Sequence, residues 1–301
     1  MTLQILVEQF FNGLQLGMML FLMAVGVTLV FGIMRVINLA HGSLAVLGAF
    51  IMMVIYHGLG ISPFGGLALT LPVMALIGVA LQLCVIEPSL KSGPLVPLLA
   101  TFGLALIADN TLFSIFGANT QSFAADIGDL SYDSWNFGSI YISQLDALVF
   151  TTGVAVLGGM QLLLSRTQIG RKIRATAEDE DAARLSGIDT RMVRVAASAL
   201  AMMMVGLAGA ALGARNSFDP YAGGPQLIYA FEAVVIGGTG SLWGTLAGGI
   251  ALGIAQALGG AVDTHLSQIA GHALFLLVLI ARLQHGGQIT SYIRRLRVRF
   301  A

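Results

Sequence analysis

Long stretches without a single Asp, Glu, Lys or Arg are the feature that most restricts how this 301-residue chain can fold. They run over 9–34, 36–86, 92–108, 110–125, 147–165, 195–214, 233–262 and 264–281. A helix needs about 20 apolar residues to cross a hydrocarbon core of roughly 30 Å. Most of the stretches approach or exceed that length, and 36–86 is long enough for two crossings. The chain is therefore expected to cross a membrane several times.

The composition excludes the main soluble classes. Hydrophobic residues make up 56% of the chain and charged residues only 10%, against roughly 25% charged in an average soluble domain. Thirty charged side chains cannot cover the surface of a soluble protein of this size, so a soluble enzyme, a DNA-binding protein and a disordered scaffold are excluded. The single cysteine, Cys84, excludes an internal disulfide framework and a cysteine-based metal cluster.

The charge-free stretches predict an all-α, polytopic transmembrane helix bundle. The first segment is too long for the apolar region of a signal peptide, so it is expected to be an uncleaved span. Between residues 56 and 64, Gly58, Gly60 and Pro63 predict a turn. Six segments are expected near 10–33, 36–56, 64–86, 95–117, 146–165 and 193–214.

The region 227–262 allows two interpretations: one long tilted span, or a short segment at 227–238 followed by a span at 245–261. Gly237, Gly238, Gly240 and Gly244 favour a turn between two segments. A last span is expected at 266–283. Basic residues concentrate in 166–194 and again at 294–299, which predicts that both lie in the cytoplasm. Only the broken version returns the chain to the cytoplasmic side after residue 194.

This topology gives one transmembrane domain over 1–301 with about eight or nine membrane segments. The N-terminus is expected to be periplasmic and the C-terminus cytoplasmic. The loop 118–145 is expected outside, and the loop 166–192 and the basic tail 284–301 inside. Fourteen of the 15 basic residues then fall on the cytoplasmic side, Arg215 being the exception. The overall charge of zero is thus expected to be the sum of two oppositely charged faces.

Motifs for chemistry within the chain are absent from the sequence. A P-loop requires Lys after a glycine-rich turn, and neither Lys91 nor Lys172 stands in that context. The His-Glu-x-x-His zinc motif and the Gly-x-Ser-x-Gly nucleophile motif are also missing. We therefore expect no enzyme activity, catalytic residue, metal site or cofactor in this chain.

The cytoplasmic segment 166–194 carries 12 of the 30 charges in 29 residues. Acidic residues at 178–181, followed by Ala182, Ala183 and Leu185 and closed by Gly187, predict a short capped helix. Glu180 and Arg184 form an i,i+4 pair on it. This helix is interpreted either as an ordinary solvated linker or as a docking element for a soluble cytoplasmic subunit.

Five polar residues stand inside apolar segments, where ionisable groups normally face a protein interior or a watery path. Asn38 and His41 are three apart and are expected on one helix face, and Asp109 and Asn110 are adjacent. Glu232 is the fifth. These residues are candidates for a translocation path. His41 could instead donate to a carbonyl of a neighbouring helix, and Asp109 and Glu232 could be protonated and purely structural.

Glycines four residues apart predict close packing of membrane helices. The pattern occurs at Gly209 and Gly213, at Gly249 and Gly253, and over Gly240, Gly244 and Gly248.

Three motifs resemble permeases of the branched-chain (hydrophobic) amino acid ABC transporter family. Residues 36–42 resemble the Ile-Asn-Phe-Ala-His-Gly signature of that family, and 235–244 resemble its late glycine-rich turn. The cytoplasmic segment resembles its ATPase-coupling loop through Gly170, Arg171, Arg174, Ala177, Glu178, Asp179, Ala182, Ala183, Leu185, Gly187 and Ile188. The three motifs stand in the family's order and cover roughly residues 35–285.

The resemblance implies an integral-membrane subunit of a bacterial ATP-driven importer that works by alternating access in the inner membrane. A periplasmic binding protein would deliver the solute, a second related permease or another copy of this chain would complete the channel, and two cytoplasmic ATPases would hold ATP and Mg²⁺. The implied solutes are branched-chain or other amino acids. No nucleic acid is expected as a partner.

Departures from the family pattern keep other solutes open. Ser43 stands where the family usually has an acidic residue, Glu232 where relatives carry a small or apolar one, and the end of the last span lacks the familiar Arg-Pro-x-Gly-Leu. Urea, short-chain amides and aromatic acids are the alternatives within the family. Outside it, the alternative is a self-sufficient secondary transporter or channel that uses Asp109 and Glu232.

Overall fold

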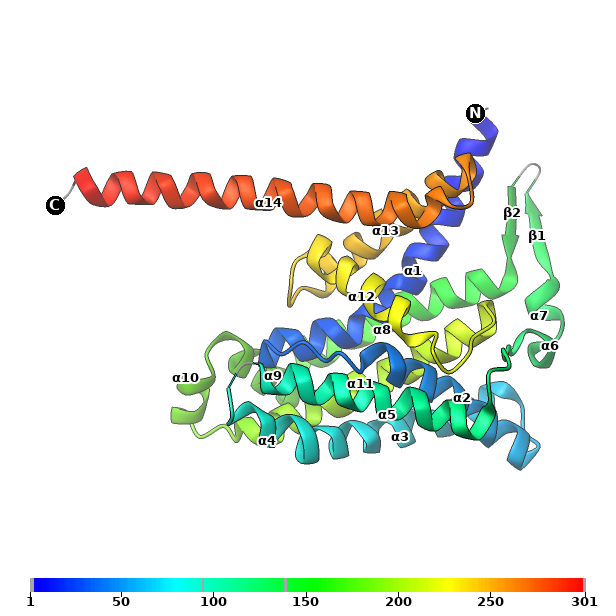
Figure 1. Ribbon diagram of the computed structural model, residues 1–301, viewed down its shortest axis with the longest axis horizontal. Coiled ribbons are helices and arrows are strands. Elements are labelled where there is room, and N and C mark those ends of the chain that lie inside the picture. The colour runs from blue at the N-terminus through cyan, green and yellow to red at the C-terminus, as the bar shows by residue number, and fades with distance from the viewer. Residues whose placement is uncertain (1–2, 94, 138–139, 300–301) are drawn as a thin grey trace.

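The computed structural model describes residues 3–93, 95–137 and 140–299 and is almost entirely helical (Figure 1). Eight helices in this part of the chain are long and apolar enough to cross a membrane, so the predicted polytopic helix bundle is confirmed. The long helices are α1 (Leu3–Met34), α2 (His41–Leu59), α3 (Pro63–Leu81), α5 (Val96–Phe116), α8 (Gln144–Arg166), α11 (Thr190–Arg215), α13 (Leu242–Val262) and α14 (Leu266–Arg299).

Short elements connect them. The π-helix η1 (Gln82–Ile86) and α4 (Glu87–Leu90) extend α3, and α12 (Gly223–Gly237) lies between α11 and α13. The loop predicted at 118–145 folds into α6 (Ala124–Ile127), α7 (Asp129–Tyr132) and an antiparallel hairpin of β1 (Ser134–Phe137) and β2 (Ile140–Ser143), with Trp135 opposite Ile142. The segment after α8 forms α9 (Gln168–Glu178) and α10 (Glu180–Leu185).

The hairpin and α10 mark the two opposite ends of the bundle, here called the hairpin end and the α10 end (Figure 1). The chain starts at the hairpin end, and α14 runs from there toward the α10 end and continues past the body of the molecule. Residues 284–299 of the predicted tail are the last turns of α14. The side chains of 285–299 and the whole of 300–301 lie outside the described residues.

The structure breaks 227–262 into two helices, as predicted. Helix α12 has 15 residues, about 22 Å at 1.5 Å per residue, which is too short for a full crossing. Gly238 (φ 98°) and Gly240 (φ 84°) take left-handed backbone conformations in the turn, which only glycine adopts at little cost. Ser241 then caps α13 by accepting from Gly244 N (3.1 Å).

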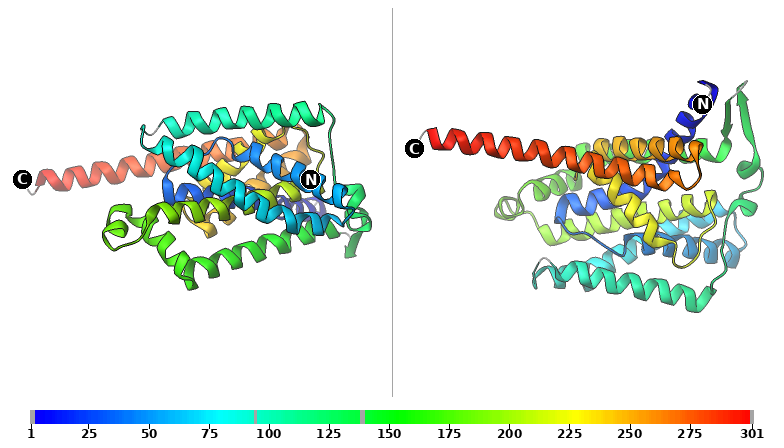
Figure 2. Two further views of the ribbon diagram at one scale, coloured as in Figure 1. Left: turned by 90° about the horizontal axis from the view of Figure 1, so that it is seen from below. Right: turned by 45° about the horizontal axis from the view of Figure 1, so that its top comes forward.

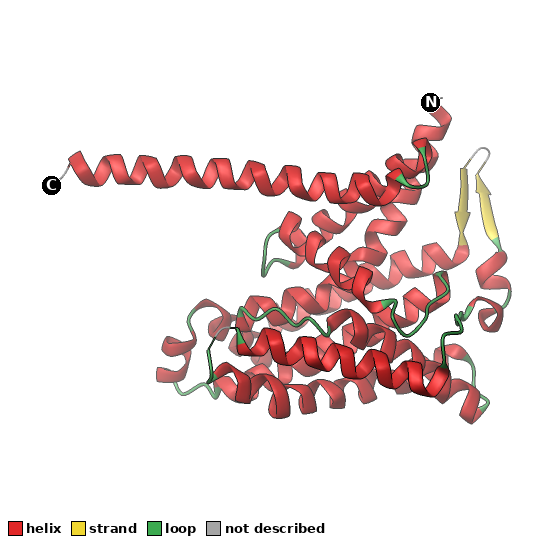
Figure 3. Cartoon of the chain, in the orientation of Figure 1, coloured by secondary structure: helices red, strands yellow, loops and turns green. Residues whose placement is uncertain are grey.

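The start of α2 differs from the prediction. The span expected at 36–56 begins helically only at His41, and 35–40 is irregular (Figure 3). Asn38 therefore does not share a helix face with His41. Its Oδ1 accepts from Ala40 N (3.0 Å), a local bond that competes with helix formation. Leu39 N donates to Thr101 Oγ1 on α5 (3.1 Å). Protein groups thus satisfy part of this non-helical backbone, as a membrane interior requires.

Glycine contacts hold the centre together, as the four-residue spacing predicted. A Cβ on Gly253 would lie 2.3 Å from Gly17 N, and one on Gly209 would lie 2.0 Å from Ala45 O. Helix α1 therefore packs backbone to backbone on α13, and α11 does so on α2. Helices α5 and α14 lie on opposite sides of this centre (Figures 1 and 2). Helix α14 packs on α13 and α12 and leaves Leu276, Leu277 and Ile280 exposed.

Candidate functional site: a coupling segment clamped to the membrane helices

The α9–α10 segment presents a short, well-capped helix at one end of the bundle. Asp179 lies between α9 and α10 and caps α10 by accepting from Ala182 N (2.9 Å). Gly187, with φ 81°, follows the end of α10, as expected from the sequence. Glu180 pairs with Arg184 at 2.8 Å. The predicted capped helix is confirmed, except that Glu178 belongs to α9.

The predicted coupling residues divide into a buried and an exposed set. Ala183 is buried, and Gly170 packs so closely on the end of α8 that a Cβ would lie 2.1 Å from Leu163 O. Ile173, which was not among the predicted residues, is buried beside them. Leu185 is 91% exposed, although it is apolar. The residues Arg171, Arg174, Glu178, Asp179, Ala182 and Gly187 are exposed as well, and Ala177 and Ile188 are partly buried. The segment thus has one face fixed to the bundle and one face free for a partner.

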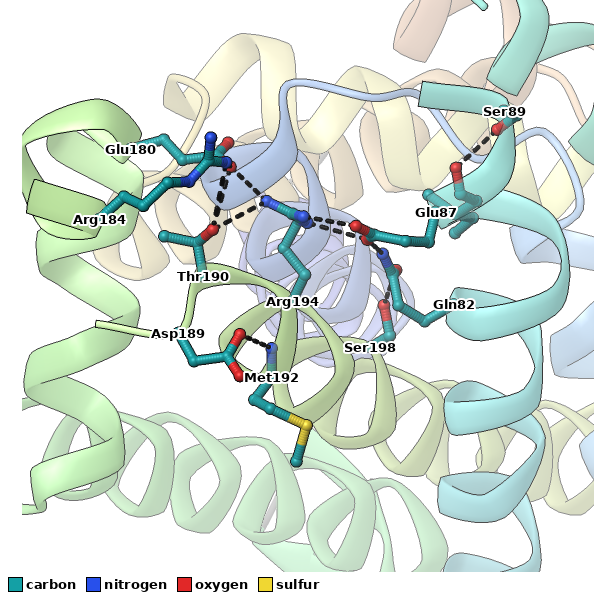
Figure 4. A network of polar contacts seen from close by, with 11 residues as sticks. Gln82, Glu87, Ser89, Glu180, Arg184, Asp189, Thr190, Met192, Arg194 and Ser198 are labelled. Atoms are coloured by element: carbon teal, nitrogen blue, oxygen red, sulfur yellow. Dashed lines mark hydrogen bonds and ion pairs between the residues drawn. The ribbon is translucent and has the colours of Figure 1, made fainter. Parts of the chain in front are cut away.

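Arg194 on α11 clamps this segment to the membrane helices (Figure 4). Its Nη2 and Nε donate to the two oxygens of Glu87 on α4, at 2.6 Å and 3.0 Å. Its Nη1 donates to Glu180 of α10. A guanidinium that forms a fork with one carboxylate and reaches a second one is a strong, directional link.

A polar network extends the clamp to η1 and into α11. Gln82 donates to Glu87 (3.1 Å), and Ser198 on α11 donates to Gln82 (2.7 Å). At the other end, Thr190 donates to Glu180 (3.2 Å). Gln82 and Ser198 are almost completely buried. Because buried polar groups are costly without partners, this network fixes the position of α10 relative to η1 and α11.

Sequence reasoning missed the clamp. Glu87 and Arg194 are 107 residues apart, and neither was among the candidate site residues. A possible signal was that both interrupt long apolar stretches at positions predicted to lie at the same membrane face. The sequence shows no spacing rule that would pair them.

Four of the five path candidates gather around the start of α2. Asn38 is 7% exposed, and its Nδ2 has no hydrogen-bond partner in the described structure. Asp109 of α5 lies against Ser43 of α2 and has one unpartnered oxygen. Asn110 is exposed, and the Tyr221 hydroxyl lies 3.4 Å from its Oδ1. Irregular backbone and unsatisfied polar atoms thus coincide inside the bundle.

His41 donates to a carbonyl of a neighbouring helix, which was the structural alternative to a role in the path. Its Nε2 donates to Met23 O of α1 (2.8 Å), and the residue is 2% exposed. The side chain therefore joins two helices through a carbonyl, and in this conformation it presents no surface to a solute.

Glu232 lies apart from the other four, on α12. Its Oε1 accepts from Nδ1 of His272 on α14 (2.5 Å), while its Oε2 is buried and has no hydrogen-bond partner among the described residues. Sequence reasoning did not select His272.

Comparison with known proteins assigns the chain to a family. Residues 9–283 match the family described as "Branched-chain amino acid transport system / permease component". The chain belongs to this family. BraD of Pseudomonas aeruginosa, a "high-affinity branched-chain amino acid transport system permease protein", is 29% identical over 91% of this chain and 93% of its own length. LivH of Escherichia coli K12, which bears the same description, is 29% identical over 91% of this chain and 92% of its own length.

The similarity extends to sugar permeases. The ribose import permease protein RbsC of Escherichia coli K12 is 30% identical over 82% of this chain and 76% of its own. No solved structure was found that matches the chain. The resemblance seen in the sequence is confirmed, and the chain is a multi-pass membrane protein of a permease family whose members are transport subunits.

Proposed function

We propose that this chain is driven by two cytoplasmic ATPase subunits that dock on α10. The observation that carries the proposal is the contrast within the α9–α10 segment. A small helix with a free, partly apolar surface at Ala182 and Leu185 is tied through Glu180 to Arg194, and through Arg194 to Glu87. A linker helix that merely faced solvent would need no such clamp. A helix that transmits force to η1, α4 and α11 does.

The distribution of charge supports a cytoplasmic position for the α10 end. Arg35 follows α1, Arg166 ends α8 and Arg191 lies in the first turn of α11. All three lie where helices terminate toward the α10 end, and positive charge favours the cytoplasmic side. In this orientation the N-terminus and hairpin are periplasmic, the C-terminus is cytoplasmic, and the membrane is a bacterial inner membrane.

The remaining partners follow from that orientation. A periplasmic binding protein delivers the solute at the hairpin end, and a second related permease, or a second copy of this chain, completes the path. ATP and Mg²⁺ bind to the ATPases, and no cofactor is assigned to this chain. Its motion is alternating access of the membrane helices.

The transported solute is proposed to be a branched-chain or other amino acid. The names of BraD and LivH support this choice. Urea, short amides and aromatic acids remain the alternatives within the family, and the relation to a ribose permease supports a family that accommodates different small polar solutes. Asn38, Asp109, Asn110 and Glu232 are the proposed polar groups of the path, with His41 supporting them through α1.

Uptake is expected to depend completely on the ATPases. Cells that express the full transporter should accumulate radiolabelled leucine, isoleucine or valine, or failing these the alternative solutes. Deleting the ATPase subunits, or replacing the P-loop lysine in both, should reduce uptake to the level of cells without the transporter. A self-sufficient secondary transporter or channel that uses Asp109 and Glu232 would keep its uptake after either change, and that result would refute the proposal.

A further inference from the structure

A buried carboxylate holds a half-exposed histidine at membrane depth on the α12–α14 side of the bundle. Glu232 is 4% exposed, and its contact with Nδ1 of His272 is 2.5 Å long. The His272 side chain is 43% exposed. The Tyr229 ring stacks on the imidazole, with centroids 5.8 Å apart and planes 11° from parallel. Two neighbours thus fix the ring and leave its Nε2 without a hydrogen-bond partner in the described residues.

His272 belongs to a polar stripe on α14. Gln268 and His272 stand four residues apart on α14, so they share one face of the helix. His265 lies in the turn just before Leu266, where α14 begins. His265 and Gln268 are exposed. The stripe starts at the hairpin end of α14 and reaches six residues, about 9 Å, beyond the first helical residue. The same helix also exposes the apolar residues Ile269, Leu276 and Leu277.

More buried polar atoms meet at this place than the described residues satisfy. Glu232 Oε2 has no partner, and neither has Nε2 of Gln256 on α13, which lies against Gly271 beside His272. Lipid chains offer no hydrogen bonds, so exposed polar side chains at this depth face water or protein. A stripe that continues from the membrane surface inward is most simply explained by water that enters along it.

We propose that Tyr229, Glu232, Gln268 and His272 line the hairpin-end half of the solute route, with His272 Nε2 as a direct solute contact. Glu232 is a positioning residue, because it holds Nδ1–H and thereby directs Nε2 outward. In the neutral ring, Nε2 accepts a hydrogen bond. The nearby negative charge of Glu232 favours a solute that donates from a cationic N–H, such as an ammonium group. This inference rests on the proposed transport function but specifies a surface and a chemistry that the function alone does not.

Cysteine labelling can show whether the face of α14 that carries Gln268 and His272 is in contact with water, since Cys84 is the only cysteine of the chain. In a Cys84→Ser background, single cysteines are placed at Gln268 and His272, and at their neighbours Ile269 and Ala273 as controls. Neighbours differ in depth by about 1.5 Å but point about 100° apart. In cells with the complete transporter, the charged, membrane-impermeant reagent trimethylammonium-ethyl methanethiosulfonate should modify Q268C and H272C at least tenfold faster than I269C and A273C.

The role of Glu232 has its own readout. The readout is the ratio of two modification rates of Q268C, that with the cationic reagent divided by that with anionic sulfonatoethyl methanethiosulfonate. This ratio should be higher than the ratio that the two reagents give with a small free thiol in solution. Glu232→Gln should move that ratio toward the free-thiol value. His272→Ala should lower uptake at least tenfold at an unchanged amount of protein in the membrane.

Equal labelling within each pair of neighbours, or unchanged uptake in His272→Ala, would overturn the inference. An unchanged reagent ratio in Glu232→Gln would remove the positioning role. These outcomes are distinct from failure of the proposed function, which shows as uptake that persists without the ATPases. The labelling pattern reports the position of the route whatever drives transport.

Discussion

Replacing Arg194 with alanine is expected to reduce uptake more than tenfold and to destabilise the α10 end of the protein. The substitution leaves Glu87, whose side chain is 14% exposed, without its cation, and removing one partner of a buried pair costs about 3 kcal/mol or more. It also frees Glu180, and with it α10, from α11. Uptake in cells and ATP hydrolysis by the complete purified transporter are the measurements. Hydrolysis should persist without matching transport.

Two further variants separate position from charge. Arg194→Lys keeps the charge but not the fork of donors, so it should retain only part of the uptake. Arg191→Ala removes an exposed arginine three residues away on the same helix and should change uptake less than twofold. If Arg194→Ala transported as well as Arg191→Ala at equal protein levels, the clamp would have no role in coupling.

Replacing Gly42 with alanine is expected to destabilise the protein strongly. A Cβ at this position would lie 1.9 Å from Gly223 O, and one on Gly223 would lie 2.5 Å from Ser43 N. The starts of α2 and α12 therefore touch backbone to backbone, and a methyl group forces them apart. Overpacking of this kind costs about 1–3 kcal/mol, and a rigid backbone contact places this case at the upper end.

The same helix offers a matched control at Gly58, where an added Cβ meets nothing within 4 Å. Gly58→Ala should leave the melting temperature unchanged or raise it, because alanine is favoured over glycine inside a helix by roughly 0.5–1 kcal/mol. Melting temperatures of the two detergent-purified variants test the difference. Equal melting temperatures would show that the contact between α2 and α12 is not tight in the protein.

Most of the membrane segments could be predicted from the sequence because the signal is strong and local. A stretch of about 20 residues without a charged side chain is explained by a helix that crosses the membrane. The glycine-rich turn at 237–244 also predicted correctly that α12 and α13 are separate helices. The predicted start of α2 was wrong by five residues, since the span was expected from residue 36 and the helix begins at residue 41. Hydropathy does not distinguish a helix from irregular backbone that is buried in protein, and the local bond of Asn38 decided the outcome.

The candidate site could be predicted only where its residues are close in sequence. Asp179, Glu180, Arg184 and Gly187 define α10 through capping and i,i+4 rules. Arg194 and Glu87 come together through the packing of α11 beside the end of α3, and no local rule contains that information. The same holds for Glu232 and His272, which are 40 residues apart on separate helices.

The most direct test of the central claim is a cross-link between α10 and an ATPase. Leu185→Cys in the Cys84→Ser background places a thiol at a residue that is 91% exposed. Leu59→Cys is the control. Leu59 is the last residue of α2, lies at the hairpin end of the bundle and is also exposed, at 63%. In the complete transporter, a short bifunctional thiol reagent should join L185C to a subunit that mass spectrometry shows to carry a P-loop, and L59C should give no such product. An ATPase cross-link from L59C but not from L185C would contradict both the docking site and the proposed orientation.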